Sequence, residues 1–72
     1  MTNITEVLTE KRQVMKDKVE ELRKEMDANY AKFDENPDDE TYLKLHKINA
    51  ELTEAIGVLY TLDRAISYEK EK

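Results

Sequence analysis

The sequence contains no cysteine and no tryptophan, and its 72 residues include one glycine and one proline. Without cysteine the chain has neither a disulfide framework nor a thiolate metal site, which stabilise many small domains. Oligomerisation is the remaining usual means of stabilisation, so this absence favours self-association. Alternating runs of strand formers are also missing, and a composition rich in Glu, Lys and Leu with so few helix breakers is typical of long helices and coiled coils.

Long hydrophobic runs are missing as well. No segment approaches the roughly 18 apolar residues of a membrane span. The first residues, MTNITEVLTEKRQ, lack the basic and apolar stretches of a signal peptide. We therefore expect a cytoplasmic protein of one domain, residues 1–72, that has no membrane partner and needs no cofactor.

The net charge of −5 is concentrated in one short segment. Residues 1–33 carry seven acidic and seven basic side chains, and residues 41–72 carry five of each. All of the excess charge therefore lies between two neutral arms. The acids that carry this excess are Asp34, Glu35, Asp38, Asp39 and Glu40. We call them the acidic turn and predict that they form a surface on which a partner docks.

The first arm predicts an amphipathic helix over residues 3–33. A step of about 3.6 residues from Ile4 meets mostly apolar positions along one stripe: Ile4, Leu8, Lys11, Met15, Lys18, Leu22, Met26, Asn29 and Phe33. Asn3 followed by Glu6 matches the spacing of a capping box at the start of a helix.

The segment FDENPDDETY interrupts this pattern. Pro37 disfavours helical geometry at Asn36 and suits the first position of a new helix, for which Asn36 is a good N-cap. The sequence therefore predicts a turn at residues 34–36 and a second helix at residues 37–69. Because so short a link makes the helices antiparallel, we expect an all-α fold, an antiparallel helical hairpin of two long helices.

The second arm is apolar over more than one stripe. Its main stripe consists of Leu45, Ile48, Leu52, Ile56, Leu59, Leu62 and Ile66. A monomeric hairpin would expose further apolar residues around AIGVLYTL, so we predict a homodimer that forms an antiparallel four-helix bundle. The predicted self-association residues are Ala55, Gly57, Val58, Leu59, Leu62 and Ile66. Gly57 either permits close approach of two backbones or lies on a solvent face, where it costs about 1 kcal/mol relative to alanine.

Residues with catalytic or metal-binding chemistry are sparse. His46 is the only histidine, and the chain has no Glu-x-x-His pair of the kind that di-iron bundles use. Acids and an amide alternate in the turn like the first ligands of a helix–loop–helix calcium site. However, Asp39 stands where that loop needs glycine and Leu45 where it needs a bidentate glutamate. We predict no catalytic, cofactor-binding or metal-binding residue.

Nucleic-acid grooves combine aromatic rings with a basic track. The chain has four tyrosines, but its basic residues alternate with acids along both arms, and this pattern disfavours nucleic acid as a partner. A hairpin dimer nevertheless resembles the plasmid-copy-number RNA-binding dimers. An RNA-binding or nucleic-acid-mimicking helical dimer is therefore kept as an alternative.

Residues 48–56, INAELTEAI, resemble the signature region of the small helical-hairpin phosphatases that act on response regulators in sporulating bacteria. That family has Ser-Gln-Glu-Leu-Asp where this chain has Asn-Ala-Glu-Leu-Thr, so Glu51 and Leu52 match. The resemblance implies, as a second alternative, a divergent phosphatase acting on a response-regulator aspartyl phosphate. Thr53 replaces the acid on which that activity depends, and this substitution argues against the activity.

The main hypothesis is a non-catalytic helical protein that self-associates and binds another macromolecule, an unidentified protein. It would act as a regulator, adaptor or inhibitor, a class that is frequent among small proteins of phages and other mobile elements.

Overall fold

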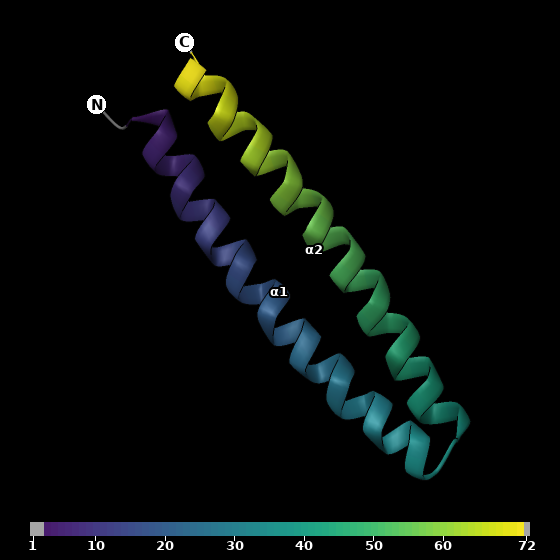
Figure 1. Ribbon diagram of the computed structural model, residues 1–72. Helices are drawn as coiled ribbons and strands as arrows, with labels where there is room; N and C mark the ends of the chain where they lie inside the picture. Colours follow the sequence, from purple (N-terminus) through teal and green to yellow (C-terminus); the bar gives the residue numbers. More distant parts are fainter. Residues whose placement is uncertain (1–2, 72) are drawn as a thin grey trace.

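The computed structural model describes residues 3–71 of the predicted domain 1–72; residues 1, 2 and 72 lie outside the described residues. The chain forms two long helices, α1 (Ile4–Glu35) and α2 (Asp39–Glu71), which run antiparallel side by side (Figure 1). The two termini lie at one end of the hairpin and the turn lies at the other. The predicted all-α antiparallel hairpin is confirmed.

Helix α1 begins and ends at polar residues that satisfy its free backbone groups. The side chain of Asn3 accepts a hydrogen bond from the Thr5 backbone N–H at 2.9 Å, as the sequence predicted for an N-cap. At the other end, the Asn36 backbone N–H donates to the Lys32 carbonyl oxygen at 3.0 Å. The helix runs two residues past the predicted end at residue 33 because Asp34 and Glu35 do not oppose helical geometry.

Helix α2 begins later than the sequence predicted. Its N-cap is Asp38, whose Oδ1 accepts a hydrogen bond from the Thr41 backbone N–H at 2.7 Å. The prediction that Asn36 caps α2 and that Pro37 occupies its first turn is wrong. Asn36, which precedes Pro37, has a non-helical backbone with φ −148° and ψ 83°, and it closes α1 instead. Residues 36–38 therefore form the turn.

The cap of α2 predicts a specific dependence of stability on pH. Hydrogen bonds from the Thr41 backbone and side chain lower the pKa of the Asp38 carboxyl below its ordinary value. A carboxylate with a lowered pKa stabilises the fold above its ordinary pKa, and this contribution is lost as the pH falls through the lowered value. We expect Asp38→Ala to lower the midpoint of thermal unfolding at neutral pH and to differ less from wild type in acid.

Asp38→Asn is the matched control because it keeps an oxygen acceptor for the Thr41 N–H and removes only the charge. We expect it to lose less stability than Asp38→Ala. A difference between wild type and Asp38→Ala that stayed constant from neutral to acid pH would contradict this role of the carboxylate.

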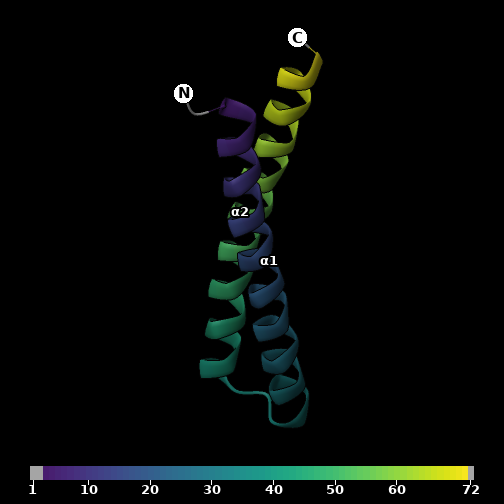
Figure 2. The same cartoon turned by 90° about the vertical axis from the view of Figure 1, so that its left-hand side faces the viewer.

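The core between the helices follows the repeat of a coiled coil, alternating intervals of three and four residues. On α2 the buried and half-buried residues that follow this repeat are Leu45, Ile48, Leu52, Ala55, Leu59, Leu62 and Ile66. On α1 the residues that follow it are Leu8, Arg12, Met15, Val19, Leu22, Met26, Asn29 and Phe33. Figure 2 shows the two helices crossing at a shallow angle, as this repeat requires.

The coiled-coil repeat corrects four positions of the predicted stripes. The sequence placed Ile56 in the core, but Ile56 is 40% exposed and its neighbour Ala55 is only 4% exposed. On α1, Ile4, Lys11 and Lys18 of the predicted stripe are exposed, whereas Arg12 is half-buried and Val19 is buried. A step of 3.6 residues differs from the 3.5-residue repeat of two helices that coil about each other, so a stripe drawn with that step misses some core positions by one residue.

The hairpin is one helix pair thick. It measures 53 × 15 × 14 Å, and its radius of gyration is 16.3 Å. A compact chain of this length has a radius of gyration of about 11 Å. No large side chain in the described part of the chain is fully buried, and no polar side chain there is buried. The fold therefore presents most of its side chains on long open faces.

Candidate interaction surfaces

The six predicted self-association residues do not form one surface. Ala55 and Ile66 are buried in the core between α1 and α2, and Leu59 and Leu62 are half-buried there. Ala55, Leu59 and Ile66 serve the contact between α1 and α2, whereas Leu62 also lines an apolar groove between the helices. The other two predicted residues, Gly57 and Val58, are exposed.

Gly57 lies on the side of α2 that faces away from α1. A Cβ atom built at this position meets no heavy atom within 4 Å, so a side chain fits without strain in the hairpin. Within the hairpin, glycine at this position is not needed for close approach between the helices.

Replacing Gly57 by alanine is expected to stabilise the protein by about 1 kcal/mol, since an exposed helical glycine costs that amount through backbone entropy. Urea unfolding followed by circular dichroism measures the gain. Ala50→Gly, at another exposed position of α2, is the matched control and should lose a similar amount. A loss of stability in Gly57→Ala would instead indicate that a second copy packs tightly against Gly57.

An apolar groove lies between the helices toward the end that carries the termini. We call it the valine groove; its volume is about 530 Å³, and its lining residues are Glu10, Lys11, Val14, Met15, Val58 and Leu62. Val14 is 68% exposed and Val58 is 40% exposed, so each helix contributes one accessible valine. The sequence analysis assigned Val58 to self-association but not Val14. Which residue of α2 lies beside Val14 depends on how the two helices pair, and the pattern of α1 alone does not show it.

The face that contains the valine groove divides into two halves. A helical step of 100° per residue identifies the residues that lie on the same side of their helix as Val14 on α1 or Val58 on α2. In the half near the termini apolar or neutral residues predominate, namely Ile4, Val7, Val14, Val58, Thr61, Ala65 and Tyr68, beside the charged Glu10, Lys11 and Glu69. In the half near the turn charged residues predominate, namely Lys18, Glu21, Glu25, Lys44, Lys47, Glu51 and Glu54, beside the apolar Leu43 and Ala50. We call the first set the terminal half-face and the second set the charged half-face.

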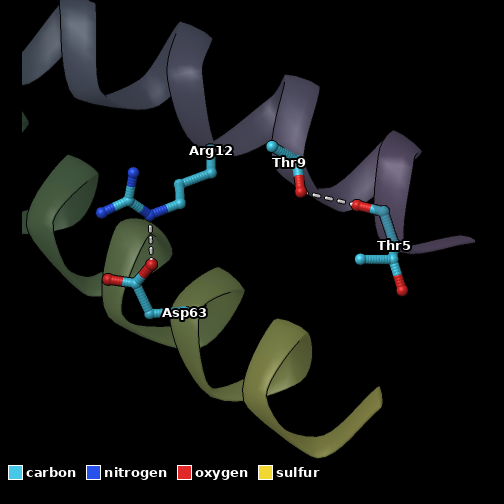
Figure 3. Close-up of polar contacts among 4 residues, drawn as sticks. All are labelled: Thr5, Thr9, Arg12 and Asp63. Carbon is cyan, nitrogen blue, oxygen red and sulfur yellow. Dashed lines mark hydrogen bonds and ion pairs between the residues drawn. The ribbon is translucent and has the colours of Figure 1, made fainter. Parts of the chain in front are cut away.

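An ion pair links the two helices near the valine groove. The Nε atom of Arg12 donates to Oδ1 of Asp63 across the hairpin (Figure 3). Figure 3 also shows the Thr9 hydroxyl donating to the Thr5 carbonyl oxygen one turn away, at 2.7 Å. The Arg12 and Asp63 side chains are 37% and 47% exposed, so the pair contributes about 0–1 kcal/mol. It favours this register of α1 against α2 more than it stabilises the fold.

Three aromatic rings lie near the turn. They line a hollow of about 290 Å³, whose lining residues are Tyr30, Phe33, Tyr42, Leu45, His46 and Asn49. The ring centroids of Phe33 and Tyr42 are 6.5 Å apart, so one ring from each helix meets above the turn. The only histidine therefore lies beside this hollow. Sequence reasoning missed the hollow, because the turn brings together rings that the sequence places on separate helices.

The acidic turn surrounds this end of the molecule with exposed carboxylates. Asp38 caps α2, and Glu40 Oε1 lies 3.9 Å from Lys44 Nζ. The side chains of Asp34, Glu35 and Asp39 form no ion pair or hydrogen bond among residues 3–71. Three of the five predicted docking residues therefore have no structural partner in the described hairpin.

Across residues 3–71, no three His, Asp or Glu side chains are grouped so that they could hold a metal ion. Thr53, which stands at the position of the phosphatase acid, is an exposed residue of α2. Neither described helix is both long enough and apolar enough to span a bilayer.

Comparison of the chain with protein-family models, with curated proteins and with solved structures finds no match. Function must therefore be argued from the surfaces themselves: the valine groove within its terminal half-face, the aromatic hollow and the acidic turn.

Proposed function

We propose that the protein is a non-catalytic helical hairpin that self-associates into a four-helix assembly and acts by binding another macromolecule. The observation that carries the proposal is the surface area of the hairpin, which is too large for a compact monomer. A monomer of 8.5 kDa exposes about 4,700 Å² by the usual scaling with mass. The hairpin exposes 5916 Å².

The excess of about 1,200 Å² is larger than the roughly 800 Å² that each partner contributes to a standard protein–protein interface, so the hairpin has enough surface to form one. Apolar side chains account for part of this excess, including Val14 and Val58. Association with a second copy covers such side chains and adds the second layer that a single helix pair lacks. The absence of cysteine suits the reducing cytoplasm that we expect for this protein.

The partner of the assembled protein is proposed to dock at the turn. The side chains of Asp34, Glu35 and Asp39 form no ion pair or hydrogen bond within residues 3–71, and Asp39 lies beside the rings of Phe33 and Tyr42. Exposed carboxylates next to aromatic rings suit a partner segment that carries lysine or arginine, because the rings attract cations through their faces. A protein that presents such a surface would act as a regulator, adaptor or inhibitor.

Sedimentation equilibrium tests the first part of the proposal. We expect a dimer at micromolar concentration, and we expect the thermal midpoint to rise with protein concentration because association stabilises the folded state by mass action. A monomer of 8.5 kDa with a midpoint independent of concentration would contradict self-association.

Neutralisation of the turn tests the second part. Asp34→Asn, Glu35→Gln and Asp39→Asn together should weaken binding of a labelled oligolysine peptide at moderate salt while leaving the helix content nearly unchanged. A control that neutralises Glu20, Glu25 and Asp27 on α1 removes the same charge elsewhere. Equal weakening by both triple variants would show that net charge, rather than the acidic turn, determines binding.

A further inference from the structure

We infer that the terminal half-face is the self-association surface, and that it is covered by the same half-face of a second copy in a tail-to-tail antiparallel dimer. In this arrangement the terminal halves of two hairpins overlap, and the two acidic turns point away from each other. The inference rests on the proposed self-association and adds which face is used, how much of it is covered and which way the copies point.

The choice of face follows from where the exposed apolar residues lie together. The valine groove is flanked by only two charged side chains, Glu10 and Lys11, and the stem of Lys11 lines it. A lysine stem can lie along apolar surface while its ammonium group stays in water. Other exposed apolar residues stand among charges; Leu43, for example, follows the acidic turn and precedes Lys44.

The extent of the contact follows from the charged half-face. Overlap along the whole hairpin would press its charged side chains into an interface, and taking charges out of water costs several kcal/mol per ion unless each one is well paired. An overlap of the terminal half-faces alone avoids this cost. Half of a face of 53 × 15 Å has a flat projection of about 400 Å² per copy.

Interdigitated side chains bury more area than a flat projection, so two copies remove about 1,000 Å² in total, the amount that a specific interface requires. An interface at this lower limit predicts reversible association with a dissociation constant in the micromolar range.

The direction of the second copy follows from the acidic turn. A parallel dimer would bring two sets of five carboxylates to the same end of the assembly, where like charges repel. A full antiparallel overlap would place each terminal half-face on a charged half-face. The tail-to-tail dimer separates the turns by more than the 53 Å length of one hairpin, far beyond the screening length of about 10 Å at 0.1 M salt.

A two-fold axis through the overlap makes this contact self-complementary. Gly57 then lies outside the interface, on the side of α2 away from α1, and both acidic turns remain accessible to a partner. The sequence-based prediction of an antiparallel dimer is retained in this proposal, with Val14 and Val58 rather than Gly57 at the contact.

Charge insertion tests the face. Val14→Glu places a carboxylate at a position that is already 68% exposed, so the hairpin should stay helical while the dimer dissociates at least tenfold more readily. Leu43→Glu is the matched control, because Leu43 is 64% exposed and lies on α2 near the turn. We expect Leu43→Glu to dimerise like wild type in sedimentation equilibrium.

Spin labels test the direction. The chain has no cysteine, so Thr61→Cys and Glu35→Cys each provide one labelling site. Labels at Thr61 in the terminal half-face should give a short distance between subunits, and labels at Glu35 should give no measurable dipolar coupling.

The outcomes separate this inference from the proposed function. A wild-type monomer overturns both. A dimer that survives Val14→Glu, or that brings Glu35 labels close together, overturns the tail-to-tail arrangement and leaves self-association intact.

Discussion

Replacing Leu52 by alanine is expected to unfold most of the protein at room temperature. Leu52 is 8% exposed and lies in the central core cluster with Val19, Leu22, Ile48 and Ala55. Truncating a buried leucine removes about 2–5 kcal/mol through lost burial and a residual cavity. A single core in a chain this small supplies about 3–5 kcal/mol, so little stability remains.

Far-UV circular dichroism and urea unfolding measure this loss. Leu43→Ala is the matched control: it removes the same atoms from the same helix, but Leu43 is 64% exposed, and we expect a change within about 0.5 kcal/mol. Comparable losses in the two variants would contradict the assignment of the core. A high protein concentration should partly rescue Leu52→Ala if folding is coupled to association.

Enlarging Ala55 to leucine is the second change expected to have a large effect. Ala55 is the most buried residue of the core at 4% exposed, and it is the only small side chain among the α2 positions that face α1. Extra methylene groups at a packed position force side chains or helices apart and cost about 1–3 kcal/mol. We expect Ala55→Leu to lower the unfolding midpoint even though leucine is a good helix former.

Ala50→Leu provides the comparison, because Ala50 lies on the exposed side of the same helix. It should leave stability nearly unchanged while adding the same side chain. If Ala55→Leu stabilised the protein, the helices would have room between them at Ala55, and the assignment of Ala55 to a tightly packed core position would be wrong.

These two substitutions also bear on how self-association and folding are related. Neither Leu52 nor Ala55 is exposed enough to contact a second copy, so substitutions at these positions should first lower the stability of the hairpin itself. Val14→Glu should show the opposite order, with dissociation and little loss of helix. In the predicted self-association set, Val58 is the residue that is both exposed and part of the lining of the valine groove. A substitution at Val58 should therefore affect association more than folding.

The sequence by itself determined the two helices, their antiparallel direction and the presence of a turn around Pro37, although not the exact residues of that turn. Helix formation depends on spacing, propensity and caps, all of which are local, and Asn3 shows this because its cap was predicted correctly. The local error at Asn36 arose because Asn36 and Asp38, on either side of Pro37, were each able to cap α2. Pro37 sets the backbone of Asn36, and Asp38 has the carboxylate in reach of Thr41.

Only the tertiary structure decided which side chains each helix turns toward the other. Because the helices coil around each other, Ala55 rather than Ile56 enters the core, and that one-residue shift removed Ala55 from the predicted self-association surface. The same pairing brought Val14 beside Val58 across the hairpin. A contact between residues far apart in the sequence depends on the register of two helices, and that register is set by the summed packing of both helices rather than by any local pattern.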